Sequence, residues 1–267
     1  MPGMMVTDRR LFRDELSSIL VSPDPVRGLL RWKERGVLEQ IIPELGACYD
    51  MTQNQYHFGT VWEHTLRVVE QVPGVLTQRL TALLHDIGKV VTREVTPEGK
   101  VHFLLHEQKG KPIIRDRLLG MEFDKGLVER VCLLTGLHMR TKQWGAQAER
   151  MKDGSLRGLQ LACGDKGCFE ELLELIDADN RSHAEGFCMP EQVGLIRQRA
   201  AELGAAGLDL FSFQLPVSEE AIRDRLFPLG SVDACVSFLR EKACKKPVRS
   251  EQEWLYLVDE FIKKERR

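Results

Sequence analysis

A histidine and an aspartate, His85 and Asp86, stand next to each other inside the apolar segment Leu83–Lys89. Burying an imidazole and a carboxylate side by side costs several kcal/mol unless each group finds a strong partner. A divalent metal ion is a partner that satisfies both groups together. The pair therefore predicts a metal site, provided that the chain supplies further ligands.

Further ligands of the same chemical kind lie at helical spacing on apolar faces, where a core residue is expected: His64, His106, His138 and Asp179. A single histidine on an apolar face is more often hydrogen-bonded to a backbone carbonyl than bound to a metal. Several together, with carboxylates, are typical of catalytic sites in which nitrogen and oxygen ligands leave positions open for water. The set is large enough to hold one metal ion or two.

The order His64, His85-Asp86, Asp179 resembles the His…His-Asp…Asp signature of the HD superfamily of metal-dependent phosphohydrolases, and Ile87-Gly88-Lys89 continues the likeness. The resemblance implies an all-α fold, a helical bundle of the HD-domain type. It also implies that His64, His85, Asp86 and Asp179 hold a metal ion.

Two segments before this signature, Ser22–Leu29 and Gly36–Leu45, resemble the neck of bacterial tRNA nucleotidyltransferases and poly(A) polymerases, where the neck leads into an HD domain. We therefore expect a helical neck over 1–50, an HD metal-binding domain over 51–210 and a helical tail over 211–267. The nucleotidyltransferase head has a Gly-Ser turn and paired aspartates, and nothing before Asp8 could supply them. The chain is accordingly not expected to add nucleotides.

The predicted chemistry is hydrolysis of a phosphoester, because a bound metal ion lowers the pKa of its water and stabilises charge on a phosphoryl oxygen. Mn, Ni, Co, Fe, Zn or Mg, one or two ions per chain, would suit such ligands. His106 and His138 would either hold a second ion, with Asp86 as the bridge, or bind phosphate and protonate the leaving oxygen. The predicted catalytic residues are Asp86, Lys89, His106 and His138.

The predicted substrate contacts are His57, Lys89 and Arg140. Lys89 follows the His-Asp motif and could pair with a phosphate, although a lysine at a helix end could equally serve the helix dipole. Arg140, together with Lys142, is also a candidate for a local RNA contact. His183 follows Asp179 by one helical turn and is expected to orient that carboxylate.

Charge and cysteine content indicate which partners and which compartment to expect. With 38 basic and 40 acidic residues the net charge is −2, so the chain has no general attraction for nucleic acid. An RNA contact would have to be local. The 7 cysteines include no Cys-x-x-Cys pair, so we expect no disulfide framework. Because no long apolar span or apolar leader occurs, we expect no membrane partner and a cytoplasmic protein.

Helical periodicity runs through nearly the whole chain. It predicts helices over 9–20, 25–34, 60–72, 77–85, 107–119, 125–138, 156–163, 166–179 and 191–203, with three more after 213. The Asp24-Pro25 and Ser218-Glu219 pairs predict helix starts. Segments 90–96 and 100–103, separated by Pro97-Glu98-Gly99, predict a small β-hairpin directly after the His-Asp motif. The hairpin would form either a wall of the site or a surface flap.

Three functions remain open at this stage. The first is a metal-dependent phosphohydrolase acting on nucleotide-like substrates or an RNA 3′ end, such as a 2′,3′-cyclic phosphodiester or a phosphomonoester. The second is a non-catalytic module that binds RNA or a separate nucleotidyltransferase subunit. The third is a hydrolase of a signalling nucleotide. Loss of turnover in Asp86→Ala would distinguish the two hydrolases from the binding module.

Overall fold

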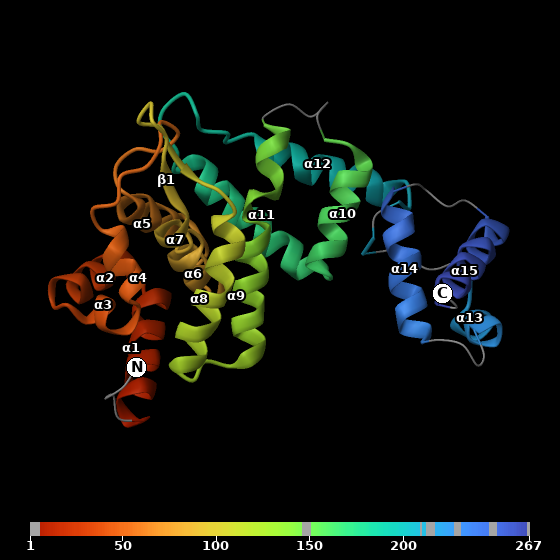
Figure 1. Ribbon diagram of the computed structural model, residues 1–267, viewed down its shortest axis with the longest axis horizontal. Coiled ribbons are helices and arrows are strands. Elements are labelled where there is room, and N and C mark those ends of the chain that lie inside the picture. The colour runs from red at the N-terminus through yellow and green to blue at the C-terminus, as the bar shows by residue number, and fades with distance from the viewer. Residues whose placement is uncertain are drawn as a thin grey trace. The chain divides into compact units, whose positions relative to one another are not determined.

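The computed structural model describes residues 6–145, 151–208, 210–211, 217–226, 231–245 and 250–265. Helices account for most of these residues, and one two-stranded sheet interrupts them (Figure 1). The predicted all-α fold with a small β-hairpin is confirmed. Among the described residues, no helix combines the length and apolar character needed to cross a membrane.

Contacts divide the chain into two compact units. The first unit comprises Met1–Gly145 and Glu170–Val193, and the second comprises Ala146–Phe169 and Gly194–Arg267. The predicted boundaries at residues 50 and 210, between neck, HD domain and tail, stay a prediction.

The first unit contains a series of helices and the hairpin. Its elements are α1 (Val6–Val21), α2 (Pro25–Glu34), α3 (Val37–Ile41), α4 (Pro43–Cys48), α5 (Val61–Gln71), α6 (Leu76–Leu84), α7 (Lys89–Thr92), β1 (Arg93–Val95), β2 (Val101–Phe103), α8 (His106–Gly120), α9 (Lys125–Leu137), the 3-10 helix η1 (His138–Trp144) and most of α11 (Lys166–Arg181). Helices α8 and α9 lie side by side (Figure 1).

The second unit is built from the remaining helices. They are α10 (Asp153–Cys163), α12 (Gln192–Ala205), which starts at the end of the first unit, α13 (Glu219–Leu226), α14 (Val232–Lys245) and α15 (Glu251–Glu265). Buried Ile222, Cys235 and Trp254 belong to one apolar cluster among α13, α14 and α15. These helices therefore share a core of their own.

The core of the first unit joins the N-terminal helices to those that carry the His-Asp motif. Leu16 of α1, Leu29 of α2, Val68 of α5 and Ile114 of α8 are fully buried in one apolar cluster. Burying such a side chain contributes about 2 kcal/mol. The segment predicted as a neck thus packs on the same core that positions the motif.

Local capping fixes the start of α5. The Thr60 hydroxyl accepts a hydrogen bond from the Glu63 backbone N–H at 3.2 Å, and the Glu63 carboxylate accepts one from the Thr60 N–H at 2.8 Å. This capping box satisfies backbone donors that the first helical turn leaves free. It sets the rotation of α5 that turns His64 toward the interior.

The hairpin begins later than predicted. Strand β1 pairs antiparallel with β2 in the register Arg93↔Phe103, but Val90–Thr92 belong to helix α7 and not to a strand. The helical turn persists because the backbone N–H of Val91 and the hydroxyl of Thr92 both donate to the carbonyl of Gly88, at 3.1 and 3.0 Å.

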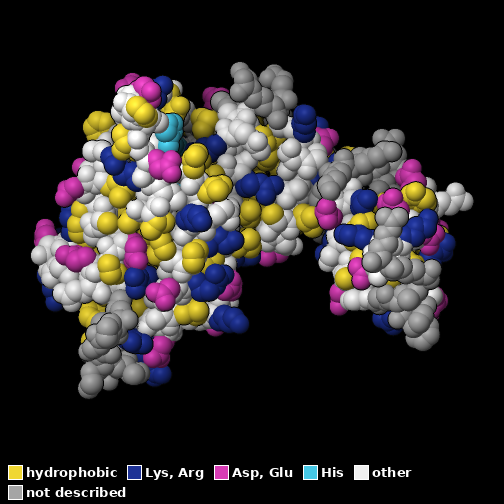
Figure 2. Space-filling model, in the orientation of Figure 1, with side chains coloured by type: hydrophobic (Ala, Val, Ile, Leu, Met, Phe, Trp, Pro, Cys, Tyr) yellow, Lys and Arg dark blue, Asp and Glu magenta, His cyan; other side chains and the backbone are white. Residues whose placement is uncertain are grey.

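The surface carries both signs of charge. On the face drawn in Figure 2, basic and acidic side chains both occur among the apolar ones, as the net charge of −2 leads one to expect. The structure shows no disulfide bond at Cys48, Cys132, Cys163, Cys168, Cys188 or Cys235.

Candidate metal centre

All the residues predicted to bind metal converge in the interior of the first unit. His64 lies in α5, His85 directly after α6, Asp86 in the turn before α7, His106 at the first residue of α8, His138 at the junction of α9 and η1, and Asp179 in α11. Each is at most 5% exposed. Residues from five segments, spread over more than a hundred positions of sequence, thus meet at one point.

Asp86 lies at the centre of the group. Its Oδ1 is 3.1 Å from Nε2 of His106, and its Oδ2 is 3.3 Å from Nε2 of His85 and 3.7 Å from Nε2 of His64. Nε2 of His64 also lies 3.1 Å from Oδ1 of Asp179. The two carboxylates are therefore linked through His64.

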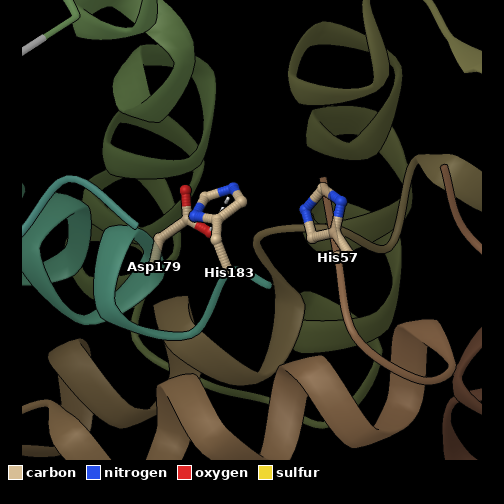
Figure 3. A group of neighbouring side chains, drawn as sticks. All are labelled: His57, Asp179 and His183. Atoms are coloured by element: carbon tan, nitrogen blue, oxygen red, sulfur yellow. Dashed lines mark ion pairs between the residues drawn. The ribbon is translucent and has the colours of Figure 1, made fainter. Parts of the chain in front are cut away.

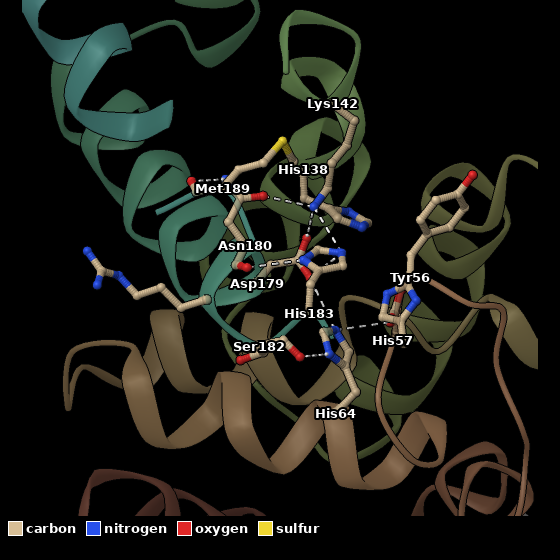
Figure 4. Close-up of polar contacts among 12 residues, drawn as sticks. Tyr56, His57, His64, His138, Lys142, Asp179, Asn180, Ser182, His183 and Met189 are labelled. Atoms are coloured by element: carbon tan, nitrogen blue, oxygen red, sulfur yellow. Dashed lines mark hydrogen bonds and ion pairs between the residues drawn. The ribbon is translucent and has the colours of Figure 1, made fainter. Parts of the chain in front are cut away.

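The outer nitrogens of the imidazole rings are held by backbone carbonyls. Nδ1 of His85 lies 2.8 Å from the oxygen of Ala82, Nδ1 of His106 lies 2.9 Å from that of Phe103, and Nδ1 of His138 lies 2.6 Å from that of Thr135. His64 makes a longer contact of this kind, 3.4 Å to Ser182 (Figure 4). A carbonyl can only accept, so Nδ1 carries the proton and a neutral ring points the lone pair of Nε2 inward.

These inward nitrogens have no hydrogen-bond donor to meet them. Nε2 of His106 faces Nε2 of His138 at 3.3 Å, which opposes two lone pairs. Nε2 of His64, Nε2 of His85 and Oδ2 of Asp86 make no aligned hydrogen bond, although all three are buried. Buried acceptors that face one another require a cation between them. The donor set of neutral imidazole and carboxylate fits a divalent metal ion.

Ligand atoms of these residues form two groups with no residue in common, and the carboxylate of Asp86, a member of the second group, also lies close to His64 and His85 of the first. His64, His85 and Asp179 make one group, and Asp86, His106 and His138 make another, with the ligand atoms of each group within 4.8 Å of one another. Since Asp86 lies between the groups, the arrangement could hold one metal ion or two.

The electrostatics favour the metal-binding protonation states. Burial opposes ionisation of Asp86, but the Lys89 ammonium and the neighbouring imidazoles outweigh it and hold the pKa of Asp86 well below its usual value. Lys142 and His64 act on Asp179 in the same way, against burial, so its pKa is also held well below the usual value. Burial lowers the pKa of His64, and it lowers the pKa of His138 to about 3.

Each carboxylate is paired with a lysine. Nζ of Lys89 lies 2.7 Å from Oδ2 of Asp86 and 2.6 Å from Oε1 of Gln53. Nζ of Lys142 lies 2.8 Å from Oδ2 of Asp179 and 3.0 Å from Oδ1 of Asn180 (Figure 4). In addition to the residues predicted to bind metal, the site thus contains two positively charged groups, the ammonium groups of Lys89 and Lys142.

A network of buried amides holds Lys142 in place. The side chain of Asn180 donates to Oε1 of Gln192 at 3.0 Å, and that of Gln192 donates to the carbonyls of Thr141 and Gly145 at 3.1 and 2.7 Å. Asn180 and Gln192 are at most 1% exposed. Because these bonds tie η1 to the end of α11, Lys142 and Asp179 keep a fixed relation.

Close backbone contact brings the His-Asp turn against α8. A Cβ on Gly88 would lie 2.0 Å from the carbonyl oxygen of His106 and 2.7 Å from the amide nitrogen of Gly110. Only glycine permits this approach. The contact places Asp86 next to His106 at the start of α8.

The group opens into a cavity of about 490 Å³. Polar side chains that line it include His57, Asp86, Lys89, His106, His138, Lys142, Asp179 and His183. His64 and His85 do not line the cavity and lie beneath it. Arg140 is exposed and does not line it either, so its predicted role in binding substrate stays a prediction.

His57 and His183 stand together at one side of this cavity. Their ring centroids are 4.7 Å apart, and Nε2 of His183 lies 4.0 Å from Oδ1 of Asp179 (Figure 3). These two rings with Asp179 form a further group whose ligand atoms lie within 4.8 Å of one another. His57, predicted as a substrate contact, thus lies in the cavity beside the carboxylate.

The sequence did not indicate the ion pair of Lys142 with Asp179 or the Gln53, Asn180 and Gln192 side chains that accompany the lysines. Polar residues in turns and at helix ends carry no periodic signal, and their partners are distant in sequence.

Comparison with known proteins agrees with this geometry. Residues 56–166 match the HD domain. Over this range the chain is similar to HD domains. HD domains form a superfamily of metal-dependent phosphohydrolases and bind divalent metals. The matched range includes His64, the His85-Asp86 pair, His106 and His138, and it ends before Asp179.

The chain also resembles tRNA nucleotidyltransferases over about half of its length. The chain is 37% identical over 137 residues to the CC-adding tRNA nucleotidyltransferase of Thermus thermophilus, covering 49% of this chain and 32% of that protein. It is 32% identical over 133 residues to the A-adding tRNA nucleotidyltransferase of Deinococcus radiodurans, covering 48% and 31%. The similarity thus spans about a third of the length of these relatives.

A relative of another kind is similar over a comparable length. The bifunctional uridylyltransferase/uridylyl-removing enzyme of Cereibacter sphaeroides is 31% identical over 143 residues, which cover 52% of this chain and 15% of that protein.

Proposed function

We propose that this protein is a metal-dependent phosphohydrolase that acts on nucleotide-like phosphoesters, including 2′,3′-cyclic phosphodiesters and phosphomonoesters. The observation that carries the proposal is the set of buried imidazole Nε2 atoms that point at one another and at the carboxylates of Asp86 and Asp179, with Nε2 of His106 and Nε2 of His138 only 3.3 Å apart. Such a set is stable only around a cation.

The proposed metal ligands come from the two groups and from the contacts that Asp86 makes with His64 and His85. His64, His85, Asp86 and Asp179 would hold one divalent ion, and His106 and His138 would hold a second, with Asp86 as the shared carboxylate. The ion would be Mn, Ni, Co, Fe, Zn or Mg, since nitrogen and oxygen ligands accept all of them. A divalent ion held there supplies a water of lowered pKa and a positive charge for a phosphoryl oxygen.

His138 is better suited to ligate a metal than to act as a general acid. Burial lowers its pKa to about 3, so the ring is neutral at neutral pH. Its one proton, on Nδ1, is donated to the Thr135 carbonyl. Of the roles that the sequence left open for His138, the structure therefore favours metal binding.

The lysines and His57 would bind the substrate phosphate. Lys89 and Lys142 each place an ammonium at the cavity lining, and each can exchange its contact with a carboxylate for one with a phosphoryl oxygen. Lys142 thereby joins Lys89 and His57 as a proposed substrate contact, while the substrate contact predicted for Arg140 stays a prediction.

The leading alternative is a module that binds RNA or a separate nucleotidyltransferase subunit without catalysis. The similarity to CC-adding and A-adding tRNA nucleotidyltransferases supports it, because those names point to the 3′ end of tRNA. A hydrolase of a signalling nucleotide is a narrower form of the main proposal.

The test is hydrolysis of a panel of phosphoesters by metal-stripped protein reloaded with each divalent ion in turn. The panel contains a generic phosphodiester, 2′,3′-cyclic AMP, AMP and a signalling nucleotide. We expect turnover that needs metal, disappears in Asp86→Ala and persists in Asp116→Ala, whose carboxylate is 74% exposed and remote from the cavity lining. A folded, metal-loaded protein that leaves the whole panel intact would favour the RNA-binding module.

A further inference from the structure

Large apolar side chains stand exposed around the mouth of the cavity. Tyr56 is 46% exposed, Phe187 42%, Leu104 70% and Met139 36%, and all four line the same cavity as the metal centre. Exposed apolar groups that gather at a polar cavity indicate a binding surface for part of a ligand.

The aromatic pair at this mouth is fixed by the backbone. The rings of Tyr56 and Phe187 meet edge to face, with centroids 5.0 Å apart and planes at 89°. The N–H of Ala184 donates to the carbonyl of Tyr56 at 3.0 Å, and His57 forms an isolated antiparallel bridge with His183. The segments that carry the two rings are therefore held together, so the rings present a preformed surface.

The cavity thus differs in chemistry from one end to the other. Its inner lining carries Lys89, Lys142 and the metal-ligating groups, whereas its mouth is apolar and aromatic. Its volume of about 490 Å³ lies in the range of pockets that enclose small organic ligands. A ligand that fits both ends must have an anionic group and a flat apolar group.

We propose that Tyr56 and Phe187, together with Leu104 and Met139, bind the nucleobase of a nucleotide whose phosphate lies at the metal centre. Every base has a flat π face that stacks on aromatic side chains. Asn54 and His102, which also line the cavity, supply polar groups that can meet the edge of the base. This inference rests on the proposed phosphohydrolase activity, because it names the substrate class for that same site.

A neighbouring residue provides a matched control. Phe58 is 73% exposed and lies two positions from Tyr56, but it does not line the cavity, and the Arg67 guanidinium lies over its ring at 5.9 Å. Removing this ring changes exposed aromatic surface without changing the mouth of the cavity.

The first measurement compares AMP with ribose 5-phosphate, which has the same phosphomonoester and no base. We expect a lower KM for AMP in the wild type. Tyr56→Ala and Phe187→Ala should each raise the KM for AMP about tenfold, which corresponds to the loss of one stacking contact. They should affect the KM for ribose 5-phosphate far less and leave kcat for AMP within about twofold, and Phe58→Ala should change neither KM.

Equilibrium dialysis of both compounds against the metal-loaded protein separates this inference from the proposed function. Tighter binding of AMP, weakened by Tyr56→Ala, supports the base site even if no phosphoester is hydrolysed, in which case only the hydrolase fails. Hydrolysis or binding that does not distinguish AMP from ribose 5-phosphate, or an equal effect of Tyr56→Ala on both, would overturn the base site.

Discussion

Replacing Gly88 with alanine is expected to separate the His-Asp turn from α8. The new Cβ would lie 2.0 Å from the His106 carbonyl oxygen and 2.7 Å from the Gly110 nitrogen. Both atoms belong to the backbone, so neither can rotate away as the end of a side chain could. The turn must move by about 1 Å to reach even the 3.0 Å at which real Cβ contacts begin.

The size of the effect follows from this geometry. Overpacking costs about 1–3 kcal/mol when neighbours can adjust, and rigid backbone on both sides places Gly88→Ala at or above about 3 kcal/mol. For a unit of this size the midpoint of thermal unfolding, Tm, should fall by about 6–12 °C. Displacing Asp86 from His106, now 3.1 Å apart, should also weaken metal binding by about 10- to 100-fold.

Two glycines of α8 provide graded controls for Gly88→Ala. A Cβ on Gly110 would lie 3.3 Å from the Gly88 nitrogen, and one on Gly120 would meet nothing within 4 Å. Thermal unfolding and metal titration of the three alanine variants should show a large loss at 88, a small change at 110 and none, or a slight gain in Tm, at 120. Wild-type Tm and metal affinity in Gly88→Ala would refute the claim that this contact assembles the site.

Further predictions concern metal, pH and the amide network. A chelator should lower Tm, because a ligand at 1,000 times its Kd adds about 4 kcal/mol to the free energy of unfolding. Asp86→Asn should remove this effect of the chelator on Tm. An equal effect in the variant would contradict the assignment of Asp86 as a ligand. The pKa of His138 is about 3 in the fold against 6.5 ordinarily, so below pH 6.5 the unfolded chain binds a proton that the native ring refuses. Urea unfolding of metal-free protein should therefore lose up to about 1.4 kcal/mol per pH unit from this residue as pH falls from 6.5 toward 3, and His138→Gln should have a correspondingly smaller slope. Gln192→Leu leaves the carbonyls of Thr141 and Gly145 without their donor and should cost about 2–4 kcal/mol in the same assay, whereas a wild-type value would mean that water replaces the amide.

The sequence predicted most of the helices because apolar residues at helical spacing mark the buried face of an amphipathic helix. Segment 25–34 matches α2, and 166–179 matches all but the last two residues of α11. The sequence did not predict short elements such as α3 and η1, because five to seven residues are too few to show a helical repeat of apolar positions. The position of the hairpin was predicted correctly. Its first strand was predicted to begin too early, because the β-branched residues Val90 and Val91 belong to a helical turn.

For the candidate site, the sequence could identify side chains that face inward but not the side chains that meet them. His64, His138 and Asp179 were recognisable because each takes a core position on an apolar stripe. The pairing of Lys142 with Asp179 could not be predicted, because it depends on the rotation of η1, which buried amides set. Likewise, the apolar mouth of the cavity is assembled from segments that are unrelated in sequence.

Burial and the neighbouring charges of the site also set how many protons leave when a metal ion binds. Ordinarily metal ligands must be deprotonated first, which makes affinity fall in acid. Here the low pKa values of Asp86, Asp179, His64 and His138 mean that these ligands are already in their metal-binding form. His85 differs: burial opposes its charge, but the carboxylate of Asp86 outweighs burial and raises its pKa. The affinity of these five ligands for a metal ion should therefore depend on pH mainly through competition with a proton at His85.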